Sequence, residues 1–256
     1  MIDFSIWQDP ETGEPLSFNR ARRGFENPRT GQLYPADSRG ILHFCGAEDA
    51  VGPDAASTRF YDRFAPFYEG GQKLYYSLYG GERKARNDYL QYLHIHPGDR
   101  VLEVSVGTGA NIRCLPPEAD YYGIDLSAGQ IEQCFLQKQR RRLPLHLCQA
   151  NAEALPFRDE SFDAVFHVGG INLFSDREAA IREMVRVARP GAPLLIADET
   201  ERVARRYQRL PFFGTPFRGR EEIVPPVDLL PPNVTDVALA DVRRGSLYCL
   251  TFCKAL

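Results

Sequence analysis

The stretch VLEVSVGTGAN at residues 101–111 decides the fold. The apolar run VLEV predicts a buried strand, and Gly107 and Gly109 predict a tight loop that leads towards a helix. This order is typical of an α/β sheet, in which the loop lets the backbone approach a nucleotide-like ligand. Ser105 stands where a further glycine would complete the loop, and its role is the first question that the sequence raises.

Strand and helix patterns alternate on the carboxyl side of this stretch. Further strands are predicted at 120–125, 145–150, 163–168 and 192–198, and helices at 127–142 and 176–188. This alternation predicts a mostly parallel sheet that is covered on both faces. Residues 234–255 instead hold two strand-like runs about an Arg-Gly-Ser turn, which predicts an antiparallel hairpin.

Both predicted helices begin with a capping-box pattern, in which Ser is followed three residues later by Gln or Glu. The pairs are Ser127 with Gln130 and Ser175 with Glu178. The basic run QKQRRR at 137–142 suits the end of the first helix, where cations are favourable to the macrodipole. A patch for RNA is the alternative interpretation of this run.

Composition limits the class of protein. The chain has 256 residues, of which 43% are apolar, and a net charge of −3, so it suits one large domain with a small appendage and has no overall basic field for nucleic acid. No apolar run is long enough to span a bilayer, and the first residues lack the pattern of a secretion signal. The six cysteines include no C-x-x-C pair, so we expect free thiols and a cytoplasmic location.

Three kinds of ligand compete for the glycine loop. A phosphate-binding P-loop needs G-x-x-x-x-G-K-[ST], and no such run occurs. A dinucleotide fingerprint needs a third glycine where this chain has Ile112. S-adenosylmethionine has no phosphate and needs a close loop and an acid for its ribose. Asp125 ends the second strand, where a carboxylate can accept hydrogen bonds from both ribose hydroxyls.

Four motifs carry a family resemblance: VLEVSVGTGAN, YYGIDLS, QANAEALPFRDESFDAVFHV and MVRVARPGAPLLIADE. In order and spacing they resemble those of class I S-adenosylmethionine-dependent methyltransferases. They are most similar to the methyltransferase type 11 branch, which includes the ubiquinone and menaquinone C-methyltransferases. The resemblance covers residues 58–200. It implies a Rossmann-like, seven-stranded, mostly parallel sheet with an antiparallel C-terminal hairpin, and S-adenosylmethionine as the cofactor.

The same resemblance assigns roles to individual residues. Glu103 would support the loop and the amino group of the cofactor, Gly107 and Gly109 would admit its methionine moiety, and Asp125 would hold its ribose. A hydroxyl at Ser105 can bond the carboxylate end. The other implied cofactor contacts are Tyr61, Tyr68, Leu126, Asn151, Ala152, Glu153 and His167. The family usually has Asp at the position of Asn151, whose amide oxygen can still accept from adenine.

The acceptor site is expected at the end of the fourth strand. His167 has the titration range of a general base and is the candidate catalytic residue. Asn172 and the pair Gly169-Gly170 are expected to shape the acceptor pocket. Residues 199–233 are expected to form a helix and then an irregular lid. Within this lid, Phe212, Phe213 and Phe217 favour an apolar acceptor, and Arg205, Arg206 and Arg209 favour an anionic one.

Residues 1–46 are expected to form a small β module, followed by a linker at 47–57 and a methyltransferase domain at 58–256. The module resembles a small zinc ribbon that accompanies some RNA methyltransferases. Its four cysteine positions hold Asp9, Thr12, Asn27 and Thr30. Because structural zinc needs thiolate or imidazole ligands, we expect no metal there and side-chain-capped turns instead.

The function expected from these features is methyl transfer to a small-molecule acceptor. The alternatives are an RNA guanine methyltransferase, a thiol methyltransferase and a non-catalytic subunit that binds S-adenosylmethionine. The ribbon-like module favours RNA, whereas the acidic balance and the lost metal ligands disfavour it. We therefore expect neither a nucleic-acid partner nor a membrane span, and the sequence leaves open whether the chain is a monomer or a homodimer.

Overall fold

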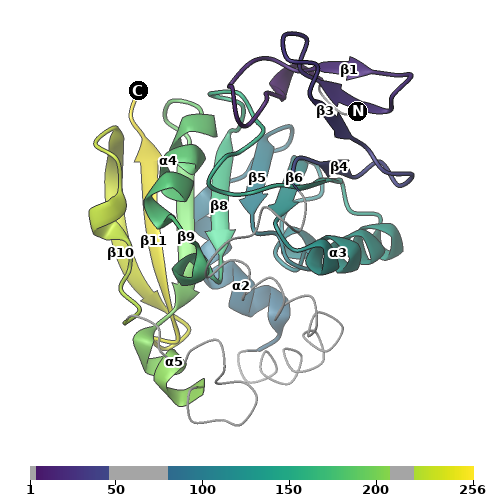
Figure 1. Ribbon diagram of the computed structural model, residues 1–256. Coiled ribbons are helices and arrows are strands. Elements are labelled where there is room, and N and C mark those ends of the chain that lie inside the picture. Colours follow the sequence, from purple (N-terminus) through teal and green to yellow (C-terminus); the bar gives the residue numbers. More distant parts are fainter. Residues whose placement is uncertain (1–3, 46–79, 208–221) are drawn as a thin grey trace.

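The computed structural model describes residues 4–45, 80–207 and 222–256 (Figure 1). Within these residues the main sheet has eight strands in the order β10-β11-β9-β8-β5-β6-β7-β4. β11 runs antiparallel to β9 and β10, and the other neighbouring pairs run parallel. The strands are β4 (Leu42–His43), β5 (Arg100–Val104), β6 (Asp120–Asp125), β7 (Leu145–Gln149), β8 (Ala164–Val168), β9 (Pro193–Glu199), β10 (Val234–Val242) and β11 (Leu247–Lys254).

Helices cover the two faces of the sheet. α4 (Arg177–Val187) packs Ile181 and Met184 into one core, while α3 (Ala128–Arg141) and α2 (Glu82–Leu90) pack Ile131 and Tyr89 into the other. The short helix α5 (Glu201–Tyr207) follows β9. The single turns of 3₁₀ helix are η1 (Phe4–Ile6), η3 (Gln91–Leu93), η4 (Ile112–Cys114), η5 (Ile171–Leu173) and η7 (Val227–Leu229). The predicted α/β class, parallel sheet and closing hairpin are confirmed.

The helix caps agree with the sequence at one helix and differ at the other. Ser127 caps α3, because its Oγ accepts from the backbone N–H of Gln130 at 3.0 Å. The N-cap of α4 is Asp176, whose Oδ1 accepts from the N–H of Ala179 at 2.8 Å, so the prediction of Ser175 was wrong. A carboxylate at this position satisfies the same donor and adds a favourable charge at the helix N-terminus.

Residues near the N-terminus form a second, antiparallel sheet that is anchored to the first. Its strands are β1 (Ser17–Asn19), β2 (Gly24–Glu26) and β3 (Leu33–Pro35). Trp7 is buried between Phe44, at 5.4 Å, and Phe157, at 4.8 Å, and its backbone bridges to Phe157. β4 then joins β7 as an eighth strand of the main sheet, one more than the expected seven. The expected linker at 47–57 lies outside the described residues.

A hydrogen-bonded cluster joins the two repeated turns DPETG and NPRTG of this N-terminal sheet. Asp9 and Asn27 are both buried, and Asn27 Nδ2 donates to Asp9 Oδ2 at 2.6 Å and to Thr12 Oγ1 at 3.1 Å. Asp9 Oδ1 also accepts from the backbone of Glu11 and Thr12. Asn27 Oδ1 accepts in the same way from Arg29 and Thr30. Each turn is therefore capped by its first side chain, and the two side chains bind each other.

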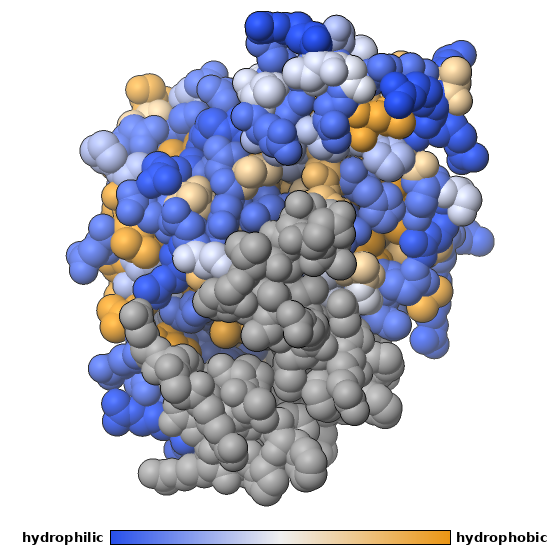
Figure 2. All heavy atoms as spheres, viewed as in Figure 1, coloured by the Kyte–Doolittle hydropathy of each residue, from blue (hydrophilic) through white to orange (hydrophobic). Residues whose placement is uncertain are grey.

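The described part of the chain includes no helix that is long and apolar enough to cross a membrane. Figure 2 shows a largely hydrophilic surface on the face in view, with separate small apolar areas. All six cysteines lie among the described residues and are free thiols. Cys249 is buried in the sheet, as expected for a small apolar side chain.

The Asp9–Asn27 cluster is expected to contribute to the free energy of unfolding. Asp9→Ala removes three hydrogen bonds to a charged acceptor and is expected to lower the free energy of unfolding by about 2–4 kcal/mol. Thr30→Ala is the matched control, because Thr30 is exposed and its hydroxyl accepts only from the backbone of Gln32. Denaturant titration measures both, and equal effects would contradict the importance of the cluster.

The pH dependence of this effect follows from the pKa of Asp9. Burial alone would raise this pKa, but hydrogen bonds from Asn27 and from the backbone of Glu11 and Thr12 lower it overall. The stabilisation is therefore present at neutral pH and is lost as the pH falls below about 4. The difference in stability between wild type and Asp9→Ala should shrink in that range.

Candidate functional site

The strand order places a topological switch point between β5 and β8. From β5 the parallel strands continue to β6 and β7 on one side, and to β8 and β9 on the other. Ligands of open α/β sheets bind at such a switch point, beyond the carboxyl ends of the strands. The polar side chains at these ends are Glu103 on β5, Asp125 on β6, His167 on β8 and Asp198 on β9.

The loop after β5 has the conformation that its glycines predict. Gly107 and Gly109 have φ of 53° and 73°, in the left-handed region. A Cβ on Gly109 would lie 2.9 Å from Cys134 Sγ on α3, so this glycine permits close packing of the helix against the loop. Ser105 has φ of 57°, which explains why a glycine fits its position and why serine there is strained.

Asp125 connects the glycine loop to the start of α3. Its Oδ2 accepts from the backbone N–H of Gly107 at 2.9 Å, and its Oδ1 accepts from the N–H of Ser127 at 2.9 Å. The carboxylate therefore holds both the loop and the helix terminus in place. It is 9% exposed at the edge of the sheet, and a carboxylate has acceptor capacity beyond two hydrogen bonds.

Glu103 is buried at 1% exposure beneath the loop. Asn111 Nδ2 donates to its Oε1 at 2.6 Å, while its Oε2 has no partner among the described residues. Burial raises the pKa of Glu103 to about 8, although the bond from Asn111 and the charge of Arg86 oppose this rise. At pH 7 the buried carboxyl is therefore mostly protonated, and a cationic ligand group would favour its ionised form.

Residues of α2 support Asn111 from behind. Its Oδ1 accepts from Arg86 Nη1 at 2.6 Å and from Tyr89 Oη at 2.7 Å. These bonds fix the orientation of the amide, so that its Nδ2 faces Glu103. The sequence pattern gave no sign of this network. Asn111 ends the deciding stretch, but nothing in its local pattern indicates a partner 25 residues earlier in the chain.

The residues after β7 that were predicted to contact adenine make hydrogen bonds to the neighbouring backbone in the structure. Asn151 Oδ1 accepts from the N–H of Glu153 at 3.0 Å, and Glu153 Oε1 accepts from the N–H of Asp176 at 2.8 Å. Ala152 is buried, and Leu126 is half-buried. Glu153 thus contacts the start of α4. The following predicted site residues lie outside the described residues: Tyr61, Tyr68, Arg209, Phe212, Phe213 and Phe217.

His167 lies at the switch point itself. Its Nδ1 is 3.1 Å from the carbonyl oxygen of Val104 on β5. Since a carbonyl can only accept, Nδ1 carries the proton and Nε2 presents a lone pair. The imidazole is fully buried, and Nε2 has no partner among the described residues. Burial lowers the pKa of His167 against the opposing charge of Asp198, which keeps the ring neutral at pH 7.

Asp198, which sequence analysis missed, organises the loop after β8. Its Oδ2 accepts from the N–H of Gly170 at 3.1 Å and from Asn172 Nδ2 at 3.0 Å. These two hydrogen bonds hold Asn172 and the Gly169-Gly170 pair beside the ends of β8 and β9. The predicted acceptor residues are therefore brought together by a carboxylate 26 residues further along the chain.

The two groups of side chains occupy opposite faces of the sheet. Glu103 pairs with Phe166, and Val104 pairs with His167, in the register of β5 and β8. Because successive side chains alternate between faces, Glu103 and His167 point to opposite sides. Asp125 belongs to the side of Glu103, since Gly123 pairs with Glu103 and lies two residues before it. The switch point thus separates an acid pair from a neutral base.

The unpartnered acceptors define what the site can bind. Gln130 Oε1 and His167 Nε2 are buried acceptor atoms, and Glu103 Oε2 becomes an acceptor when its carboxyl ionises. None of the three has a partner among the described residues. Gln130 Oε1 lies 3.8 Å from where a Cβ on Gly107 would be, beside the loop. Buried acceptors need donors. S-adenosylmethionine offers an ammonium and hydroxyls and carries no phosphate, so the acid pair fits it.

Comparisons with known proteins agree with this geometry. Residues 102–196 match the family model of a methyltransferase domain. The chain is 37% identical over 120 residues to a demethylmenaquinone methyltransferase of Beutenbergia cavernae, covering 46% of this chain and 48% of that protein. It is 42% identical over 106 residues to a phthiotriol/phenolphthiotriol dimycocerosates methyltransferase of Mycobacterium ulcerans, covering 40% of this chain and 38% of that protein. The chain spans about half the length of these relatives, or less.

Solved structures share the fold at low identity. The cyclase SpnF has a TM-score of 0.61 at 18% identity, covering 78% of this chain and 95% of that one. An S-adenosylmethionine-dependent methyltransferase of Thermotoga maritima has a TM-score of 0.56 at 20% identity, covering 77% and 98%. These likenesses confirm the Rossmann-like fold alone. The matched domain and the named relatives are methyltransferases, which implies S-adenosylmethionine as the methyl donor.

The strain at Ser105 leads to a prediction. Ser105→Gly removes a left-handed non-glycine residue, which costs about 1–2 kcal/mol, but adds about 0.5–1 kcal/mol of backbone entropy loss. The free energy of unfolding should therefore rise by up to about 1.5 kcal/mol. Ser105→Ala, which keeps the Cβ, should bring no gain. A loss of stability in the glycine variant, measured by denaturant titration, would instead show that the hydroxyl makes a stabilising contact.

Proposed function

We propose that this chain is an S-adenosylmethionine-dependent methyltransferase that acts on a small-molecule acceptor. The observation that carries this proposal is the acid pair at the switch point, in which Glu103 lies buried and Asp125 holds the glycine loop. The family match over residues 102–196 supports the same cofactor. Both named relatives are methyltransferases, one of a demethylmenaquinone and one of phthiotriol lipids, which favours a small-molecule acceptor.

The acid pair has two separate tasks in this proposal. Glu103 would accept from the ammonium of S-adenosylmethionine through its unpartnered Oε2. Asp125 would accept from the ribose hydroxyls while it continues to hold Gly107 and Ser127. Contacts from Leu126, Asn151, Ala152, Glu153, Tyr61 and Tyr68 stay predictions. The contact of the Ser105 hydroxyl with the cofactor also stays a prediction, because this hydroxyl makes no hydrogen bond with the described residues.

His167 is the proposed general base. The cofactor would supply an electrophilic methyl group on a sulfonium, so transfer needs chiefly alignment and a deprotonated acceptor. The fixed tautomer leaves Nε2 as a lone pair that can take a proton from an acceptor O–H, N–H or C–H group. Burial lowers the pKa of His167, so the ring is unprotonated at pH 7 and its Nε2 is available to take a proton. Asp198 would act as a positioning residue, through Asn172 and the backbone of Gly170.

The three alternative functions make different demands on the chain. An RNA guanine methyltransferase needs a basic surface, which a net charge of −3 does not favour. A thiol methyltransferase needs no base, because a thiolate is already a nucleophile. A non-catalytic subunit would bind the cofactor without an acceptor, and the oriented lone pair of His167 argues against it. The cytoplasmic location remains a prediction.

We also propose that the N-terminal sheet is a ribbon in which hydrogen bonds replace a metal. Asp9, Thr12 and Asn27 stand at three of the expected ligand positions and bind one another directly. Thr30, at the fourth, donates its backbone N–H to Asn27. No group of His, Cys, Asp or Glu within the described ranges has the arrangement of a metal site. A chelator should therefore leave the stability of this module unchanged.

Cofactor binding should release a proton. Glu103 has a pKa of about 8 in the free protein, and an ammonium beside it would favour the carboxylate, so binding at pH 7 should release about one proton. Calorimetric titration with S-adenosylmethionine in two buffers of different ionisation enthalpy measures this number. Glu103→Gln should abolish the release, whereas Glu178→Gln, on the exposed side of α4, should keep it. Binding without proton release would contradict the role of Glu103.

His167→Gln tests the proposed base. Radiolabelled methyl transfer to quinols, phenols, thiols and RNA should fall by about 10²–10⁴-fold on the preferred acceptor, while the thermal shift with S-adenosylmethionine stays unchanged. His146→Gln is the matched control, because His146 lies near the amino end of β7. Burial lowers the pKa of His167, so the wild-type rate should decline only below pH about 6.5.

Other outcomes of this assay would overturn parts of the proposal. Full activity of His167→Gln on a thiol alone would favour the thiol alternative. Labelled RNA would overturn the small-molecule acceptor. A thermal shift with NAD and none with S-adenosylmethionine would overturn the cofactor assignment itself.

A further inference from the structure

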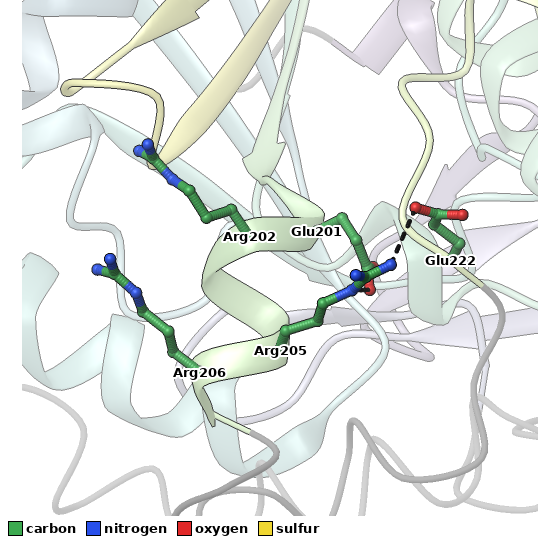
Figure 3. A pocket seen from close by; sticks show the side chains of 5 residues that line it. All are labelled: Glu201, Arg202, Arg205, Arg206 and Glu222. Carbon is green, nitrogen blue, oxygen red and sulfur yellow. Dashed lines mark hydrogen bonds and ion pairs between the residues drawn. The ribbon is translucent and has the colours of Figure 1, made fainter.

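A charged pocket of about 430 Å³ lies at α5, beside the carboxyl end of β9. Figure 3 shows the five side chains that line it, three arginines and two glutamates. The lining residues are Glu201, Arg202, Arg205, Arg206 and Glu222. Its volume is within the range of small-molecule sites, about 300–1,000 Å³. The first arginine follows Asp198 by four residues, so the pocket opens at the same edge of the sheet as the switch point.

Both glutamates are engaged by one arginine. Arg205 Nε donates to Glu201 Oε1 at 2.8 Å, and its Nη2 lies 3.4 Å from Glu222 Oε1. The other oxygen of Glu201 accepts from the backbone N–H of Ile223 at 2.9 Å. Figure 3 shows these three side chains on one side of α5. The negative charge of the pocket is therefore concentrated there and is opposed by Arg205.

Arg202 and Arg206 project together from the other side of α5 (Figure 3). They are four residues apart on the helix, and like charges at this spacing destabilise a helix. Arg206 makes no ion pair or hydrogen bond with a described residue, and both side chains are exposed. Nothing within the described part of the chain neutralises this pair. An oxyanion bound between the two guanidinium groups would do so.

The turn between β10 and β11 holds Arg202 in position. Arg243, Arg244 and Gly245 all have positive φ, and Arg202 Nη2 donates to the carbonyl oxygen of Arg244. A Cβ on Gly245 would lie 2.9 Å from Arg202 Nη2, so a larger residue there would make this guanidinium shift. Thr200 Oγ1 secures the same turn by donating to the carbonyl of Gly245 at 2.9 Å. One guanidinium of the pair is therefore preorganised, with donors left for a ligand.

We propose that Arg202 and Arg206 bind an oxyanion, a phosphate or a carboxylate, carried by the methyl acceptor. That the bound molecule is a methyl acceptor rests on the proposed function, whereas the anion site itself rests on the pocket alone. The pocket lies beyond β9, on the side of the switch point that holds His167 and Asp198. An acceptor anchored here by its anionic end would extend towards these residues with its reacting end.

Titration with inorganic pyrophosphate and with succinate, at constant ionic strength, tests the anion site. Binding is followed by NMR of the arginine Nε–H groups and by calorimetry. At least one of the two anions should bind saturably to the wild type. The double variant Arg202→Gln/Arg206→Gln should bind it at least about tenfold more weakly, because charge-assisted hydrogen bonds are lost. Arg182→Gln, an exposed arginine paired with Glu178 on α4, should bind like the wild type.

The outcomes separate this inference from the proposed function. No saturable binding of either anion, or equal binding by the double variant, would overturn the anion site. The thermal shift with S-adenosylmethionine should be the same in the double variant and the wild type, which also shows that the variant is folded. Absence of this shift in the wild type would overturn the proposed function and leave the anion titration valid. With an anionic acceptor from the methylation panel, the double variant should raise KM and leave kcat within about twofold.

Discussion

The carboxylate of Asp125 is the contact on which the rest of the site depends. It binds the backbone N–H of Gly107 with one oxygen and that of Ser127 with the other. A strand end, a glycine loop and a helix terminus are thereby fixed to one side chain. If this carboxylate is lost, two backbone donors lose their acceptor, and the loop is no longer held against α3. The acid therefore has a structural role before any ligand binds.

The sheet separates two kinds of chemistry at the switch point. On one face, Glu103 is buried with a raised pKa, and its orientation is fixed through Asn111 by Arg86 and Tyr89. On the other face, His167 is buried with a lowered pKa and a defined tautomer. Burial disfavours the charged form of each group, so both are held neutral until a partner of suitable charge or a donor arrives. In the proposed function, this division would place the cationic cofactor on one face and the proton-bearing acceptor on the other.

The N-terminal sheet contributes through packing rather than through the site. Trp7 packs between Phe25 of the N-terminal sheet and Tyr122 of the main sheet, and β4 closes the β7 edge of the main sheet. An exposed strand edge would present unpaired backbone groups, so the short β4 and the N-terminal sheet protect this side. Asp9 and Asn27 hold the two turns of this sheet together without a thiolate. Its attachment therefore needs buried polar groups that satisfy each other, in addition to apolar contacts.

The sequence by itself determined the elements and the local signals. Apolar periodicity predicted β5 to β9 and the closing hairpin to within one or two residues, and the glycine loop with Asp125 predicted the class of cofactor. Tertiary structure alone decided which distant residues contact the side chains of the site. The support of Glu103 by Asn111 and Arg86, the contact of His167 with Val104 and the role of Asp198 join residues between 8 and 63 positions apart. Such pairs depend on strand order and register, which packing of the whole chain selects and no local spacing encodes.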